Sequence, residues 1–224
     1  MAFKTVFFDA AGTLIHLRRP VGETYAQIAA EHGLEIAPEA LNAAFRAAWK
    51  QSPPPVHPVG MVPGDDDRAW WRGLVKTTFA QVLGRHLPDS ELEPLFTRLY
   101  DHFAEPAAWL VYDDVRPTLE ALRGTHRLLV LSNFDRRLRR ILAGHGLDGY
   151  FDGMVISSEV GASKPHPRIF EAALRMAGAL PSECLHVGDD LKADIEGAQA
   201  AGVATFQVKR PELGLSDVLR LVRS

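Results

Sequence analysis

The chain has 224 residues, a length that fits one large domain or a core carrying an inserted subdomain. Its 46% share of hydrophobic residues is enough for a packed interior, while a net charge of -3 gives no basic face of the kind that nucleic-acid binding needs. Small molecules are therefore the expected partners, and neither a nucleic acid nor a membrane is expected. The single cysteine, Cys184, allows no intrachain disulfide, and no apolar run is long enough to span a bilayer, so the expected location is the cytoplasm.

The first clear strand pattern lies near the N-terminus. Residues 5–8 form an apolar, β-branched and aromatic run, which is typical of a strand buried on both faces of a parallel sheet. Asp9 follows at the predicted carboxyl end, and Gly12 and Thr13 let the chain turn sharply beside its carboxylate. Ligands of open α/β sheets bind at the carboxyl ends of strands, so Asp9 is a candidate functional residue. Taken alone, however, the pattern fits an ordinary turn or helix-capping residue better than a functional one.

Residues 16 to about 108 show helical periodicity and no convincing strand. Apolar side chains recur at three- and four-residue spacing over 25–34, 41–49, 68–83 and 90–103. Between the second and third of these stretches, residues 51–67 hold five prolines and two glycines, which predicts a loop.

From Val111 onward, short apolar strands alternate with helices. Strands are predicted at 128–131, 154–156, 184–187 and 205–208, with helices at 116–122, 138–142, 169–176, 195–201 and 217–222. The strand at 5–8 cannot pair with the helices next to it, so it should join the later strands. The order predicts an α/β fold with a central parallel sheet of five strands. Its core would be residues 1–15 and 109–224, with residues 16–108 as an inserted all-helical subdomain.

Polar residues follow two further core strands and suggest an anion site. Ser132 and Asn133 come directly after the strand at 128–131, and their side chains and backbone N–H groups suit phosphate oxygens, although a helix cap is equally plausible. Lys164 precedes a proline between the third and fourth core strands and would neutralise an anion, although a lone lysine is usually a surface residue.

Three carboxylates, Asp189, Asp190 and Asp194, follow the strand at 184–187. Carboxylates this close repel one another unless they are solvated or neutralised by a cation, and their hard oxygen atoms favour Mg²⁺. The sequence therefore predicts a magnesium site at this edge of the sheet.

These segments together resemble a known family. Asp9 with Gly12-Thr13, Ser132-Asn133, Lys164-Pro165, and Gly188-Asp189-Asp190 with Asp194 are similar, in order and spacing, to the four motifs of the haloacid dehalogenase (HAD) superfamily of hydrolases. The runs NFD, GASKPHPRIF and GAQAAG resemble subfamily I, whose members have a helical C1-type cap inserted between the first and second motifs. The resemblance implies a Rossmann-like core with residues 16–108 as that cap.

The resemblance also implies a Mg²⁺-dependent phosphatase for a small phosphorylated metabolite. Asp9 would attack phosphorus and become an aspartyl-phosphate, and Thr13 would orient Asp9. The phosphoryl oxygens would be held by Ser132, Asn133 and Lys164, and Mg²⁺ by Asp9, the backbone carbonyl of Ala11 and Asp189, with Asp190 or Asp194 acting through water.

Ala11 departs from the family's phosphatase pattern, which has a second Asp two residues after the nucleophile as proton donor. A methyl group transfers no proton, so other hydrolase activities of the superfamily remain alternatives.

Dehalogenases of the superfamily also lack this acid, but they resemble metal-free enzymes without the acidic cluster. Phosphonoacetaldehyde hydrolases have Ala here and use a cap lysine, for which this chain offers Lys50 and Lys76. A non-catalytic protein that binds a phosphorylated ligand would retain the same residues. The substrate and the oligomeric state stay undetermined at this level.

Overall fold

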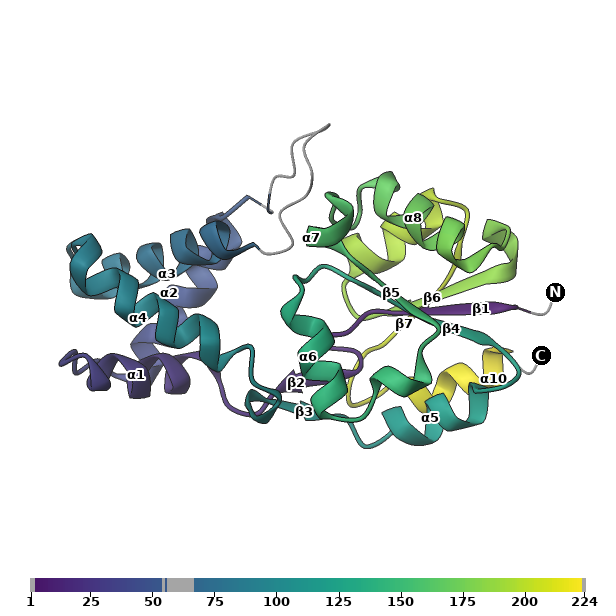
Figure 1. Ribbon diagram of the computed structural model, residues 1–224, viewed down its shortest axis with the longest axis horizontal. Helices are drawn as coiled ribbons and strands as arrows, with labels where there is room; N and C mark the ends of the chain where they lie inside the picture. The colour runs from purple at the N-terminus through teal and green to yellow at the C-terminus, as the bar shows by residue number, and fades with distance from the viewer. Residues whose placement is uncertain (1–2, 54, 56–66, 223–224) are drawn as a thin grey trace. The chain divides into compact units, whose positions relative to one another are not determined.

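The computed structural model describes residues 3–53, 55 and 67–222, and these residues form two compact units (Figure 1). One unit contains residues 3–16 and 110–222, and the other contains residues 17–53, 55 and 67–109. Most of the loop predicted at 51–67 lies outside the described residues.

A five-stranded parallel sheet is the centre of the first unit. Its strands, in spatial order, are β5 (Gly153–Ile156), β4 (Arg127–Ser132), β1 (Thr5–Phe8), β6 (Cys184–Gly188) and β7 (Ala204–Gln207). All four residues of β1 are buried, as its apolar sequence predicts. Phe8 pairs with Val130 on one side and Val187 on the other, so Asp9 leaves the sheet between the ends of β4 and β6. The predicted α/β fold with a five-stranded parallel sheet is confirmed.

Helices cover both faces of this sheet: Figure 1 shows α8 (Pro167–Ala177) on one side and α5 (Val115–Leu122) with α10 (Val218–Val222) on the other. Ile169 and Phe170 of α8 are fully buried in one apolar cluster with Phe7 of β1 and Leu129 of β4. Burying side chains of this size stabilises the fold by roughly 1.5–3 kcal/mol each. The remaining helices are α6 (Arg137–Gly144), α7 (Ser157–Val160) and α9 (Gly197–Ala200).

The segment between β6 and α9 differs from the predicted helix at 195–201. It contains a π-helical turn, Leu191–Glu196, that begins four residues earlier. The carboxyl group of Asp194 folds back against Gly188, and a side-chain Cβ at Gly188 would collide with it. A π-helical turn widens the backbone locally and is frequent at functional sites.

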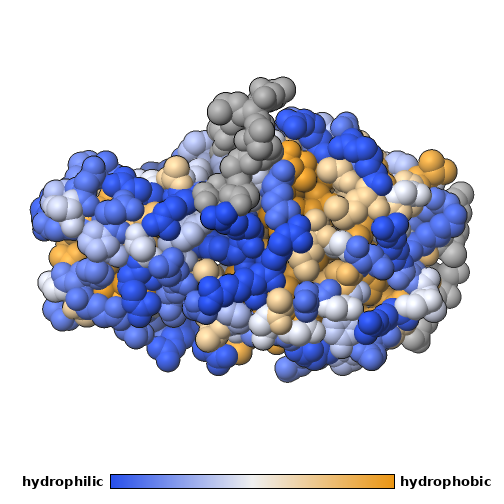
Figure 2. Space-filling view, in the orientation of Figure 1, coloured by the Kyte–Doolittle hydropathy of each residue, from blue (hydrophilic) through white to orange (hydrophobic). Residues whose placement is uncertain are grey.

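The described residues of the second unit contain four α-helices, in line with the helical pattern predicted for the insertion: α1 (Val21–Glu31), α2 (Pro38–Gln51), α3 (Arg68–Leu83) and α4 (Asp89–His102). Their apolar stripes meet in a core where the ring of Tyr25 stacks on that of Phe79, with centroids 5.9 Å apart. The face of this unit in Figure 2 is mostly hydrophilic, as expected when amphipathic helices turn their apolar stripes inward.

Two short strands at the borders of the insertion were not predicted. β2 (Ile15–Leu17) and β3 (Trp109–Val111) form a separate two-stranded sheet. Strands of three residues carry too little alternation for a period to be recognised. Among the described residues, no helix combines the length and the apolar character needed to cross a membrane.

Candidate active site

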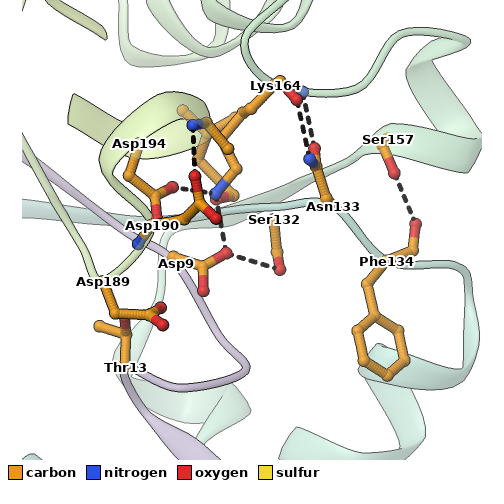
Figure 3. A network of polar contacts seen from close by, with 12 residues as sticks. Asp9, Thr13, Ser132, Asn133, Phe134, Ser157, Lys164, Asp189, Asp190 and Asp194 are labelled. Atoms are coloured by element: carbon orange, nitrogen blue, oxygen red, sulfur yellow. Dashed lines mark hydrogen bonds and ion pairs between the residues drawn. The ribbon is translucent and has the colours of Figure 1, made fainter. Parts of the chain in front are cut away.

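Asp9 lies at the carboxyl end of β1, and the structure fixes one of its two carboxylate oxygens (Figure 3). Oδ1 accepts hydrogen bonds from the Ser132 hydroxyl at 3.0 Å and from the Lys164 ammonium at 2.7 Å. Oδ2 has no hydrogen bond within the described part of the chain. The predicted nucleophile therefore has one anchored oxygen and one oxygen available to a ligand.

Lys164 is buried, with 1% of its side chain exposed. Its Nζ donates to Asp9 Oδ1, to the Leu131 carbonyl at 2.8 Å and to Asp194 Oδ1 at 2.5 Å. An ammonium has three N–H donors, and here each of them has an acceptor. Burial alone would lower the pKa of Lys164, but the carboxylates of Asp9 and Asp194 outweigh it and raise the pKa, so the side chain stays charged.

The Asn133 side chain does not point at a ligand. Its Nδ2 donates to the Lys164 carbonyl at 2.9 Å, and its Oδ1 accepts the Lys164 backbone N–H at 2.6 Å. We predicted that Asn133 holds phosphoryl oxygens, and this pairing corrects the prediction for its side chain. The amide fixes the backbone that carries Lys164, which leaves only the Asn133 main chain for a phosphoryl oxygen.

Asp194 is held from three directions. Its Oδ1 accepts from Lys164 and from His186 Nε2 at 2.9 Å, and its Oδ2 accepts the Asp190 backbone N–H at 3.0 Å. Burial would raise its pKa, but the Lys164 ammonium and the His186 hydrogen bond lower it below the ordinary value. Asp194 therefore stays ionised although only 1% of the residue is exposed.

His186 on β6 belongs to this network, and the sequence did not single it out. Burial, together with the nearby Lys164 charge, lowers its pKa and keeps the imidazole neutral. A carboxylate only accepts hydrogen bonds, so the ring proton is on Nε2. Nδ1 is then an unprotonated nitrogen, buried and without a partner among the described residues. The available signal was a polar residue inside an apolar strand, two positions before Gly188.

The Thr13 side chain is hydrogen-bonded to Asp189. Its hydroxyl donates to Asp189 Oδ1 at 3.2 Å, so this bond is to a proposed metal ligand, and the orienting of Asp9 by Thr13 stays a prediction. Gly12 has a φ of +94°, and a Cβ there would lie 2.5 Å from Asp189 Oδ2. The turn after β1 is thus shaped to receive the Asp189 carboxylate.

Asp189 is exposed as a residue, but its carboxyl group is partly enclosed by protein. This loss of water, followed by the charges of Asp9 and Asp194, raises the pKa of Asp189 to about 6. Burial is also the main cause that raises the pKa of Asp9, with Lys164 opposing the increase and Asp194 adding to it. Three carboxylates therefore face a single ammonium, and the imbalance favours a bound cation.

Asp9, Asp189 and Asp194 each place one carboxylate oxygen within 4.8 Å of the other two. Asp190 is not part of this group. Its side chain accepts the Ala193 N–H at 2.6 Å and caps the π-helical turn, so of the two residues predicted to act at the metal through water, Asp190 and Asp194, only Asp194 lies in the group.

The turn after Asp9 closes around the carbonyl of Ala10, which accepts the backbone N–H groups of Thr13, Leu14 and Ile15. The Ala11 carbonyl has no such bond among the described residues, and the Ala11 side chain is exposed. The carbonyl predicted as a metal ligand thus remains available.

Comparison with known families gives the same assignment. The model of the haloacid dehalogenase-like hydrolase family matches residues 3–202 of the chain. The chain belongs to this family. The chain is also similar to the human protein "Haloacid dehalogenase-like hydrolase domain-containing protein 3". The two sequences are 39% identical, and the match covers 98% of this chain and 87% of the human protein.

Solved structures resemble the HAD-like chain in fold. The putative HAD-hydrolase YfnB from Bacillus subtilis, solved bound to magnesium, has a TM-score of 0.74 at 18% identity and covers 100% of both chains. The L-2-haloacid dehalogenase from Xanthobacter autotrophicus has a TM-score of 0.69 at 23% identity, over 99% of this chain and 83% of its own. The same fold therefore serves more than one reaction, and the site residues have to discriminate.

Proposed function

We propose that this HAD-like chain is a Mg²⁺-dependent phosphatase that hydrolyses a small phosphorylated substrate through an aspartyl-phosphate on Asp9. The observation that carries this proposal is the state of Asp9: Lys164 and Ser132 hold Oδ1, Oδ2 has no hydrogen bond among the described residues, and the carboxylate belongs to a group of three. Residues 16–108 would form the substrate-selecting cap, and residues 1–15 and 109–224 the catalytic core.

The donor set fits Mg²⁺. Asp9, Asp189 and the Ala11 carbonyl would supply hard oxygen ligands, which this ion prefers. Asp194 has three of its lone pairs occupied by Lys164, His186 and the Asp190 N–H, so it would act through a water molecule. When bound, Mg²⁺ would neutralise the charge that develops on the transferring phosphoryl group.

The protein's own residues would divide the reaction between them. A carboxylate oxygen of Asp9 would form a bond to phosphorus as the bond to the leaving oxygen breaks, and water would then cleave the aspartyl-phosphate to release inorganic phosphate and free Asp9. The Lys164 ammonium and the Ser132 hydroxyl hold Asp9 Oδ1, which sets the carboxylate's orientation.

Ala11 restricts the leaving group. No proton donor stands two residues after the nucleophile, so an acyl phosphate or another ester whose leaving oxygen departs as an anion would be the favoured substrate class. The acidic group at Asp9, Asp189 and Asp194 supports phosphoryl chemistry over cleavage of a carbon–halogen bond, for which a cation would have no role.

The decisive experiment follows turnover of an activated aryl phosphate with and without Mg²⁺ in wild type and in Asp9→Asn. We expect activity that requires Mg²⁺ and is lost in Asp9→Asn. Asp148→Asn serves as the control, because it changes an exposed carboxylate of the same unit. Unchanged turnover in Asp9→Asn would remove Asp9 as the nucleophile.

A second measurement separates an enzyme from a binding protein. Incubation with an acyl phosphate, followed by rapid acid quench, is expected to leave a phosphoryl group on the peptide that contains Asp9. Tight binding of a phosphorylated metabolite with no adduct and no turnover of any substrate class would instead establish a phospho-ligand binding protein.

A further inference from the structure

Arg210, which follows β7, contacts the turn after Asp9. Its Nη2 donates a hydrogen bond to the Thr13 carbonyl at 3.1 Å, across 197 positions of sequence. The hydroxyl of the same threonine donates to Asp189. The guanidinium therefore holds the backbone of a residue whose side chain contacts a proposed metal ligand.

The guanidinium is itself fixed by two further neighbours. Its Nη1 and Nη2 donate to Asp114 Oδ2 at 3.1 Å and Oδ1 at 2.9 Å, and its Cζ lies 3.7 Å from the centroid of the Tyr112 ring. Asp114 also accepts the Leu215 backbone N–H at 2.6 Å. A paired, stacked guanidinium has little rotational freedom, so the bond to Thr13 is directed.

Packing alone does not account for an arginine here. Only 21% of the side chain is exposed, and Nε is buried without a hydrogen-bond partner among the described residues. A lysine could not pair with both oxygens of Asp114 and still reach the Thr13 carbonyl with a fixed geometry.

We propose that Arg210 is a positioning residue for the turn of residues 10–15. Through the Thr13 carbonyl it fixes the Thr13 hydroxyl, and through that hydroxyl the Asp189 carboxylate. The effect on Mg²⁺ binding rests on the proposed function, whereas the effect on the turn does not.

The test of the turn is backbone hydrogen exchange in the metal-free protein. Arg210→Met keeps an apolar stem over Tyr112 and removes every donor. The matched control is Arg127→Met, because Arg127 also donates to a backbone carbonyl, that of Ala177 at 3.0 Å, in the same unit. We expect exchange of the 12–15 amides to accelerate at least about threefold in Arg210→Met and to stay unchanged in the control. Unchanged exchange in Arg210→Met would overturn the proposal.

Arg210→Lys is measured in parallel, in case Arg210→Met does not fold, and exchange of the same amides is expected to accelerate in it as well.

The test of the link to Asp189 is a calorimetric titration with Mg²⁺. Changing a residue that orients a metal ligand typically weakens binding about 10- to 100-fold, and Arg210 acts one step further away, so we expect Kd to rise about 3- to 10-fold. Thr13→Val removes the intermediate hydroxyl, and adding Arg210→Met to it should weaken binding no further. Wild-type Mg²⁺ affinity in Arg210→Met would overturn the link. A wild-type protein that binds no Mg²⁺ would instead contradict the proposed function, and hydrogen exchange would then decide the role of Arg210.

Discussion

Lys164 and Asp194 form an ion pair with 2.5 Å between Nζ and Oδ1, and both side chains are almost fully buried. A pair of the same length joins Lys4 to Glu183, but there 70% of the lysine side chain is exposed. Water screens the exposed pair, whereas the buried pair interacts in a medium of low polarity. The two pairs therefore separate the effect of burial from the effect of distance.

Lys164→Met should lower the free energy of unfolding by about 3–5 kcal/mol, because it leaves buried carboxylates without their ammonium. Lys4→Met is the control and should change the stability little. Urea denaturation of both variants at neutral pH provides the comparison. Equal effects of the two substitutions would mean that burial of the Lys164 pair contributes nothing.

The cost of Lys164→Met should depend on pH. Asp194 has a folded-state pKa below its ordinary 3.8, so its pairing stabilises the protein above about pH 4, and this contribution is lost as acid protonates the carboxylate. Lys164 has a pKa raised above 10.5, so its contribution is complete below that pH. The difference between wild type and Lys164→Met should therefore be largest near neutrality and shrink as the pH falls below 4. A difference that is constant from pH 3 to pH 7 would contradict this assignment.

Ala11→Asp should raise kcat/KM for unactivated alkyl phosphates more than for aryl phosphates. An alkyl leaving group needs a proton, and a well-placed general acid typically contributes about 10²- to 10⁴-fold. The measurement is the ratio of the two kcat/KM values at one pH and saturating Mg²⁺, with Ala11→Asn as a control of similar shape and no proton to give. If the ratio stays constant while fold and Mg²⁺ affinity are intact, the missing acid does not limit this protein.

Gly12→Ala should weaken Mg²⁺ binding, because the new Cβ would lie 2.5 Å from Asp189 Oδ2 and displace that carboxylate. Gly124→Ala is the matched control: its φ of +83° is similar, but no atom lies within 4 Å of the added Cβ. Both variants carry backbone strain of roughly 1–2 kcal/mol and should lose thermal stability, with the displacement of Asp189 adding to the loss in Gly12→Ala. Only Gly12→Ala should also change the Kd for Mg²⁺, and equal Kd values would show that the close approach to Asp189 is unimportant.

Cys184 should resist alkylation in the native protein. Burial raises the pKa of its thiol to about 11, and the residue is fully buried in β6. The thiolate is the reactive form, so iodoacetamide at pH 8 should label the native chain far more slowly than the chain in denaturant. Mass spectrometry of quenched samples measures both rates, and rapid native labelling would show that β6 opens readily.

The sheet was predictable because each core strand is a short apolar run that ends at a polar turn. The proximity of Asp9, Lys164 and Asp189 followed from the same pattern, since parallel strands bring their carboxyl ends to one edge. The hydrogen-bond partner of each site side chain could not be predicted from this pattern. Whether the Thr13 hydroxyl meets Asp9 or Asp189 depends on how the turn folds around the Ala10 carbonyl, and sequence spacing carries no information on that direction.

The roles of Asp190, Asp194 and His186 also could not be predicted, because they depend on how the backbone folds locally. The three carboxylates after β6 are equivalent as a pattern, but a π-helical turn makes Asp190 a cap and buries Asp194. His186 was missed because a single polar residue in an apolar strand also fits a buried side chain with no part in a site.

The two units carry separate natural probes of unfolding. All four tryptophans, Trp49, Trp70, Trp71 and Trp109, belong to the helical unit, whereas the single cysteine belongs to the sheet unit. Tryptophan fluorescence, excited at a wavelength where tyrosine absorbs little, therefore reports on the helical unit during a thermal melt, and thiol labelling reports on the sheet. Coincident transitions would mean that the insertion and the sheet unfold as one cooperative system, and separate transitions would mean that either can be lost while the other persists.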